Sequence, residues 1–285
     1  TMRKFKYPLL LLLVLSVVAA EGYGQYVRVQ GAVEMNDGKL HPGVAYACMD
    51  LKNRMQNSGK TESAWNVIVG QEQETEAEEW PVREFETVDQ SYFDDALFIG
   101  DSRMVGMSEY SGLDNATYYA EVGLTIYSLF DEPIAPLADG SMGTLEQALR
   151  EKQFGKIYLM VGINELGTGT REKFLETYSA AVEHIKELQP NAIIFIQGIL
   201  YVTEERSAED EYINNLNIQL RNMDISKLAD QRRTFYIDVN TVYSDGKGNL
   251  STEYTFDSAH LKAACYDQWV TFLMEHGIVT TPPES

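Results

Sequence analysis

Short apolar runs alternate with amphipathic stretches from about residue 92 to the end of the chain. The runs are rich in β-branched and aromatic residues and end at glycine or a polar residue, as buried strands do. In the stretches between them, apolar residues recur every three or four positions, as on one face of a helix. The strands expected are 96–99, 117–122, 156–161, 192–199 and 234–239. The helices expected are 102–110, 144–153, 171–188, 208–228 and 261–276.

Strands that alternate with helices predict a parallel sheet covered by helices on both faces. The fold class expected is therefore α/β, with a doubly wound, five-stranded parallel sheet. Sheets of this kind bind ligands beyond the carboxyl ends of their strands. The residues that directly follow the strands are thus where chemistry is expected.

Candidate chemical groups follow four of the five strands. Ser102 comes after the first strand, at the start of a helix whose free N–H groups and dipole favour a developing negative charge. Gly123 closes the second strand and Asn164 follows the third. Asp257 and His260 come some distance after the fifth. All of these residues are expected at one edge of the sheet.

The order and spacing of these groups resemble those of the SGNH, or GDSL-type, hydrolase family over about residues 92–277. The matching blocks are Gly100-Asp101-Ser102, Gly123, Gly162-Ile163-Asn164 and Asp257-Ser258-Ala259-His260. The resemblance implies a flavodoxin-like sheet and esterase or acyltransferase activity. The chain departs from the family pattern at Arg103, where leucine is usual, and at Glu165, where aspartate is usual.

The resemblance implies catalytic roles for Ser102, Asp257 and His260. A serine hydroxyl becomes a good nucleophile when an imidazole takes its proton, and a carboxylate holds that imidazole in the right tautomer. The backbone N–H groups of Ser102 and Gly123 and the side-chain amide of Asn164 would form the oxyanion hole. Each such donor is worth roughly 3 kcal/mol.

Each of these residues also has a simpler structural interpretation. Ser102 could be only a helix N-cap, Asn164 could cap the turn after its strand, and His260 could be a histidine satisfied at a helix start. These interpretations explain the residues singly. They do not explain why all four blocks occur in the family's order.

Other function classes find little support. The sequence contains no His-Glu-x-x-His, Gly-x-Gly-x-x-Gly, P-loop or Gly-x-Ser-x-Gly motif, so neither a metal nor a cofactor is expected. A formal net charge of −20 disfavours binding to nucleic acid or to an anionic membrane surface. Cys48 and Cys265 fit no metal spacing. We expect Cys265 in the core, and whether the two cysteines pair stays open.

The N-terminal segment predicts export. Basic residues precede an apolar run at 9–20 that ends in Val18-Ala19-Ala20, as a signal peptide does. We expect residues 1–20 to be a signal peptide or short membrane anchor, 21–91 an acidic and largely disordered spacer, and 92–285 the hydrolase domain. The protein is then secreted or on the cell surface. It would contact the membrane only through an uncleaved N-terminal segment.

The function predicted is an exported serine esterase that cleaves a small acyl ester, from a carbohydrate or cell-wall polymer, through an acyl-serine. Its partner would be a small-molecule or glycan ester. A glycan O-acyltransferase and a non-catalytic glycan-binding module remain alternatives. A short acyl group is favoured because the loops at 168–170 and 201–210 are polar, and the apolar stretch 124–137 is expected to be a buried helix rather than an acyl groove.

Overall fold

The computed structural model describes residues 18–21, 23 and 80–279, and the chain divides into two units, 1–78 and 79–285. Residues 18–21 and 23 of the first unit are helical. No helix among the described residues is long and apolar enough to cross a membrane. Most of the predicted signal segment and acidic spacer, with Cys48, lies outside the described residues.

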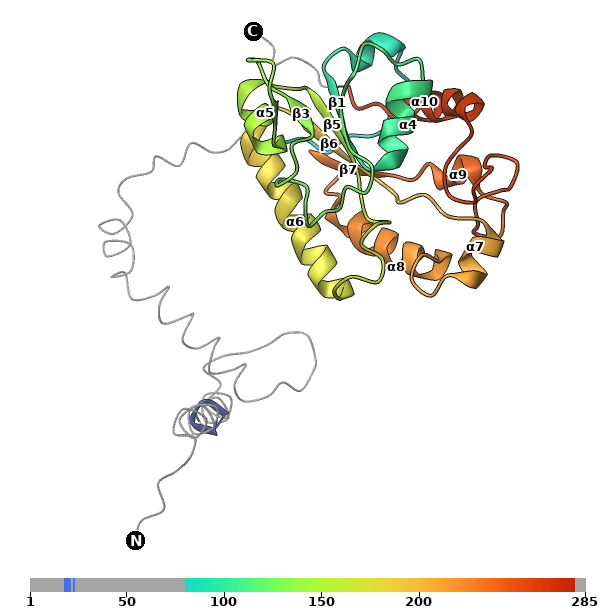
Figure 1. Ribbon diagram of the computed structural model, residues 1–285. Coiled ribbons are helices and arrows are strands. Elements are labelled where there is room, and N and C mark those ends of the chain that lie inside the picture. The colour runs from blue at the N-terminus through green and yellow to red at the C-terminus, as the bar shows by residue number, and fades with distance from the viewer. Residues whose placement is uncertain (1–17, 22, 24–79, 280–285) are drawn as a thin grey trace. The chain divides into compact units, whose positions relative to one another are not determined.

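A five-stranded sheet forms the centre of the second unit (Figure 1). Its strands are β1 (Ala96–Gly100), β2 (Thr117–Ala120), β5 (Lys156–Met160), β6 (Ile193–Gln197) and β7 (Thr234–Ile237). They lie in the order β2-β1-β5-β6-β7, and every neighbouring pair is parallel. This is the flavodoxin-like order, so the predicted fold class is confirmed. The strand bounds differ from those predicted by one or two residues.

Helices cover both faces of the sheet, as Figure 1 shows. The helices α5 (Leu145–Glu151), α6 (Arg171–Leu188) and α8 (Asn215–Ile225) contribute to the core on one face. The opposite core includes α4 (Ser102–Tyr110), the 3-10 turn η3 (Ala263–Cys265) and α10 (Tyr266–Met274). Cys265 is buried there, as predicted.

Successive strand residues alternate between the two cores. Leu97 and Ile99 face one core, while Phe98 faces the other. On that second face, Phe98 pairs in register with Tyr158, and their rings stack at 4.5 Å. Both faces are apolar because both are covered, which explains why the strands read as nearly continuous hydrophobic runs.

The helix predicted at 171–188 is confirmed as α6, whereas the one predicted at 208–228 is split. Residues 204–209 form α7 (Glu204–Glu209), and α8 begins only at Asn215. Between them, the Asp210 carboxylate accepts hydrogen bonds from the N–H groups of Tyr212 and Ile213. This turn interrupts the helix, and Asn214 then caps α8.

The prediction of a helix at 124–137 is wrong. This segment consists of turns that lead into a small antiparallel hairpin of β3 (Ala135–Pro136) and β4 (Met142–Gly143). Thr125 and Ser128 bond each other's backbone N–H groups, which closes a local turn in place of a helical one. Leu124 and Leu129 are nevertheless buried, so the apolar pattern marked core residues.

The folded unit begins earlier than the predicted boundary at residue 92. Residues 80–91, the N-terminal strap, pack along the domain and end in the 3-10 turn η1 (Gln90–Phe93). Glu86 pairs with Gly277 in an antiparallel bridge. The Phe85 ring lies 5.8 Å from that of Phe235 and 5.1 Å from that of His276. The sequence did not indicate this packing, because the segment is mostly polar and only a few of its residues, such as Phe85, are apolar and contact the domain.

Candidate active site

Ser102 is the first residue of α4, directly beyond the end of β1. The cap of this helix is Asp101, whose carboxylate accepts a hydrogen bond of 3.0 Å from the Arg103 N–H. The interpretation of Ser102 as the N-cap is therefore wrong. Its hydroxyl instead lies 2.8 Å from Nε2 of His260. Ser102 and His260 are 158 residues apart in the sequence, and the fold brings their side chains together.

His260 and Asp257 are held in one rigid loop. Nδ1 of His260 lies 2.7 Å from one Asp257 oxygen, while the other oxygen accepts bonds from the N–H groups of His260, at 2.7 Å, and Ala259, at 3.0 Å. Ser258 has a φ of +72°, which makes the turn tight enough for these contacts. Thr255 and Leu261 close the loop through an antiparallel bridge.

These hydrogen bonds keep Asp257 ionised. Partial burial by itself would raise the pKa of the carboxyl. The bonds from the backbone and ring of His260 outweigh that effect and hold the pKa of Asp257 well below its ordinary value. A fixed carboxylate at Nδ1 leaves Nε2 free to accept a proton from the Ser102 hydroxyl.

Three neighbouring strands bring hydrogen-bond donors to this edge. The N–H of Ser102, after β1, and that of Gly123, after β2, have no hydrogen-bond partner among the described residues. Gly123 has a φ of +82°, which glycine adopts without strain. Asn164, after β5, donates from its amide to the Leu124 carbonyl at 3.0 Å, which leaves its second amide N–H available. These are the donors that an oxyanion hole requires.

Two buried charged residues support the site, and in the sequence they stand out only as departures from a motif. The guanidinium of Arg103, which is buried, donates to the Ala259 carbonyl at 3.4 Å and lies 3.9 Å from Asp101. It therefore connects α4 to the loop of His260. Burial raises the pKa of Asp101, and the charge of Arg103 opposes that rise. The sequence signal that could have identified Arg103 was a charged residue at a position where the family usually has an apolar leucine.

Glu165 is the second of these residues. It is buried, and one of its oxygens accepts a hydrogen bond from the Ile126 N–H. Burial raises the pKa of Glu165 to about 7, although the Ile126 bond opposes the rise. Its other oxygen has no hydrogen-bond partner among the described residues.

The described part of the chain contains no cluster of histidine, cysteine and acidic residues that could hold a metal ion. The groups that the structure brings together at this edge are the hydroxyl, the imidazole, the carboxylate and the N–H donors described above. Together they suit proton transfer and acyl transfer.

The GDSL-like Lipase/Acylhydrolase family matches residues 98–268, more than half of the chain. The chain belongs to this family. The predicted resemblance is thereby confirmed, and hydrolysis of an acyl ester is the reaction class that membership gives. No curated protein matches the chain.

Several solved structures are similar to this GDSL-like hydrolase. A candidate platelet activating factor from Streptococcus pneumonia is 23% identical, with 80% of this chain and 97% of that one covered and a TM-score of 0.49. An acetyl xylan esterase, AlAXEase, is 20% identical, with coverage of 62% and 96% and a TM-score of 0.44. An acetylxylan esterase from Geobacillus stearothermophilus is 15% identical, with coverage of 63% and 92% and a TM-score of 0.45.

Proposed function

We propose that this GDSL-like hydrolase is an exported serine esterase that removes a small acyl group from a carbohydrate or cell-wall polymer. The observation that carries the proposal is the continuous hydrogen-bonded chain from Ser102 through His260 to Asp257, with distances of 2.8 and 2.7 Å. This geometry suits a nucleophile, a general base and the group that orients the base.

The reaction proceeds in two halves. Nε2 of His260 takes the hydroxyl proton as Oγ of Ser102 bonds to the ester carbonyl carbon, and the carbonyl oxygen becomes an oxyanion. The N–H groups of Ser102 and Gly123 and the Asn164 amide stabilise that charge. The ester bond then breaks, and the alcohol leaves with the proton from His260. A water molecule, deprotonated by His260, attacks the acyl-serine, releases the acid and restores the Ser102 hydroxyl.

Polar surroundings support a small acyl group on a hydrophilic alcohol. A cavity of about 290 Å³ lies beside Gly123, and its lining combines the polar residues Glu121, Ser128 and Glu132 with the apolar residues Val122 and Leu124 on either side of the glycine. The nearby apolar residue Leu129 is buried in the core and does not line this cavity. A long acyl chain requires a contiguous apolar lining, which this cavity lacks.

Carbohydrate as the alcohol is supported by an exposed aromatic ring next to the catalytic loop. Phe256 precedes Asp257 and is 89% exposed, with Lys262 over one side of its ring at 4.4 Å. An exposed aromatic ring is suited to binding a partner with apolar faces and polar edges. Export rests on the sequence of residues 1–20, with its basic start and apolar run.

Labelling with a fluorophosphonate tests the nucleophile directly, because the probe reacts only with an activated serine. We expect the full chain and the Ser108→Ala variant to be labelled and Ser102→Ala to remain unlabelled. Ser108 is a matched control on the same helix, since its hydroxyl bonds the Val105 carbonyl and no other described residue. Labelling of Ser102→Ala would overturn the assignment.

Rates on p-nitrophenyl acetate, butyrate and octanoate test the acyl group. We expect kcat/KM to be highest for acetate. A steady rise with chain length would overturn the small-acyl assignment and favour a lipid ester. Release of acetate from acetylated oligosaccharides by the full chain, compared with Ser102→Ala, then tests the carbohydrate assignment.

A further inference from the structure

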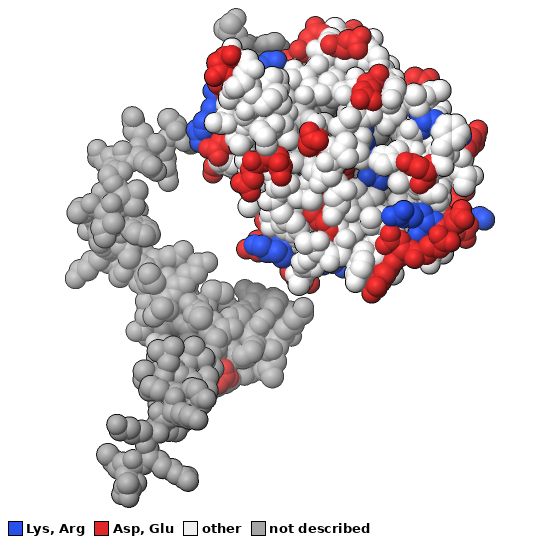
Figure 2. Space-filling view, viewed as in Figure 1, with Lys and Arg blue, Asp and Glu red and all other residues white. Residues whose placement is uncertain are grey.

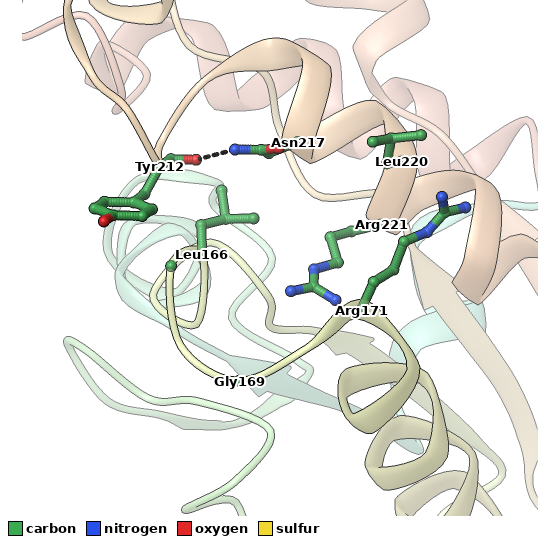
Figure 3. A pocket seen from close by; sticks show the side chains of 8 residues that line it. Leu166, Gly169, Arg171, Tyr212, Asn217, Leu220 and Arg221 are labelled. Atoms are coloured by element: carbon green, nitrogen blue, oxygen red, sulfur yellow. Dashed lines mark hydrogen bonds between the residues drawn. The ribbon is translucent and has the colours of Figure 1, made fainter.

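A second cavity opens beside the loop that carries Asn164. Its volume is about 330 Å³, and it lies between the β5–α6 loop and α8 (Figure 3). We call it the Arg221 pocket. Its lining includes Gly167, Gly169, Arg171, Tyr212, Asn217 and Arg221.

Arg221 is the distinctive group in this pocket. Its side chain is buried, with 7% of the residue exposed, and the guanidinium lies 4.5 Å from the centre of the Phe174 ring. Its hydrogen bond to another residue is a long one, from Nη1 to the Thr170 carbonyl at 3.4 Å. No carboxylate pairs with it among residues 80–279. A guanidinium has five N–H donors, so most of its hydrogen-bonding capacity is available to a ligand.

The nearby charged groups leave the Arg221 pocket positive. Asp224, the nearest ionised carboxylate on α8, is neutralised by Arg171 and by Lys227, which lies 3.0 Å away. Figure 3 shows the Arg171 side chain turned away, while the Arg221 guanidinium is directed towards the loop of Leu166 and Gly169. Glu165 also lies within electrostatic range, and because burial raises its pKa to about 7, it carries only part of a negative charge at neutral pH.

Such a site is unusual on this protein. The net charge is −20, and Figure 2 shows acidic side chains spread over the face in view, with basic ones in a few small groups. An unpaired and nearly buried arginine therefore requires an explanation. Since burying an unpaired charge is costly, the arrangement suits an anionic group that would complete its pairing.

The Arg221 pocket is close to the proposed catalytic centre. Gly167 is only three residues beyond Asn164, so the two can be at most about 11 Å apart along the chain. The charge of Asp101, next to Ser102, and the charge of Arg221 both act on Glu165. One substrate molecule could therefore occupy both places.

We propose that the Arg221 pocket binds the carboxylate of an acidic sugar in the acylated substrate, an inference that rests on the proposed function. The guanidinium pairs with the carboxylate through two parallel hydrogen bonds. The Tyr212 ring, which is half exposed at the rim, packs against the sugar ring. Asn217 donates to the Tyr212 carbonyl at 2.9 Å and thereby holds this segment in place. The preferred substrate is thus an acylated glycan that contains uronate.

Binding to Ser102→Ala, measured by NMR titration with glucuronate, glucose and glucose 1-phosphate, tests the site without turnover. We expect glucuronate to bind at least about tenfold more tightly than glucose, and more weakly as salt is added. The double variant of Ser102→Ala with Arg221→Gln should lose that preference. The double variant of Ser102→Ala with Arg150→Gln should keep it, because Arg150 is an exposed arginine paired with Glu146 and its loss changes the charge equally. Equal affinity for glucuronate and glucose would overturn the proposal. Tighter binding of glucose 1-phosphate would overturn the uronate assignment in favour of a phosphate.

Two further variants test the Arg221 pocket in case Arg221→Gln does not fold. Tyr212→Ala changes a half-exposed side chain and should weaken glucuronate binding about threefold or more, because the ring contact is lost. Arg221→Lys keeps the charge but loses the two-pronged geometry, and we expect intermediate affinity. Unchanged affinity in both variants would contradict the proposal.

Activity assays separate this inference from the proposed function. With Ser102 intact, Arg221→Gln should lower kcat/KM for acetylated glucuronate about tenfold relative to that for p-nitrophenyl acetate. Failure of the full chain to hydrolyse p-nitrophenyl acetate would overturn the esterase proposal, while glucuronate binding would still be measurable. If the protein is an active esterase but Arg221→Gln leaves the ratio of the two kcat/KM values unchanged, only the role of the Arg221 pocket would be overturned.

Discussion

The carboxylate of Glu165 accepts a hydrogen bond from the backbone N–H of Ile126. This contact joins the loop after β5, which carries Asn164, to the loop after β2, which carries Gly123. The bond from the Asn164 amide to the Leu124 carbonyl, 3.0 Å long, joins the same two loops a second time. The donors proposed for the oxyanion hole are therefore held in place before any substrate binds.

The first prediction concerns the pH dependence of stability. Burial raises the pKa of Glu165 from 4.5 to about 7, so the folded state holds this proton more tightly than the unfolded state. The contribution of Glu165 to the free energy of unfolding is fully present below pH 4.5 and is lost as the pH rises through 7. The loss is at most about 3 kcal/mol. Glu165→Gln stays neutral and keeps an oxygen for the Ile126 N–H.

Urea unfolding at pH 5 and pH 8 measures the effect. We expect the unfolding free energy of Glu165→Gln to fall less between these pH values than that of the unchanged protein. Glu109→Gln, at an exposed position on α4, serves as the control and should behave as the unchanged protein does. Parallel pH dependence in Glu165→Gln and the unchanged protein would contradict the role given to Glu165.

The second prediction ranks the members of the proposed triad. Ser102→Ala and His260→Ala should each remove nearly all hydrolysis of p-nitrophenyl acetate, because both act in one proton transfer. Asp257→Asn should also lower kcat strongly, yet less than Ser102→Ala, since the carboxylate orients His260 and does not itself react. Circular dichroism checks that each variant folds. More than about a tenth of the original rate in Ser102→Ala or His260→Ala would refute the triad.

The third prediction separates an oxyanion donor from a substrate-binding residue. Asn164→Ala should lower kcat about a hundredfold with little change in KM, because the oxyanion exists only after attack begins. Thr168→Ala, at an exposed position on the same loop, is the matched control and should change neither constant appreciably. A change confined to KM would show that Asn164 binds the substrate in its ground state.

The fourth prediction concerns the N-terminal strap. A chain that begins at residue 92 loses four backbone hydrogen bonds to residues 231–277, two of them between Glu86 and Gly277, and the contacts of Phe85. We expect it to be less stable than a chain that begins at residue 80 by roughly 2–5 kcal/mol. Urea unfolding of the two chains measures the difference. Equal unfolding free energies would show that the strap contributes nothing to the fold.

The sequence by itself determined the sheet, its helices and the candidate residues at its edge. The periodicity of apolar residues reports which face of a segment is buried, and this depends mainly on neighbours close in the chain. For that reason all five strands and α6 could be predicted from the sequence. The blocks around Ser102, Asn164 and His260 could be recognised because each role requires one residue type at a fixed spacing.

Only the tertiary structure decided how the polar residues pair. Arg103 bonds a carbonyl 156 residues away, Glu165 bonds an N–H 39 residues away, and Arg221 pairs with no carboxylate in the part of the chain that the structure describes. The break between α7 and α8 and the packing of the N-terminal strap depend likewise on specific hydrogen bonds and on a few anchoring side chains. Hydrophobic periodicity contains no information about such pairings, because a buried polar group is stabilised by whichever partner the folded chain brings within hydrogen-bond distance.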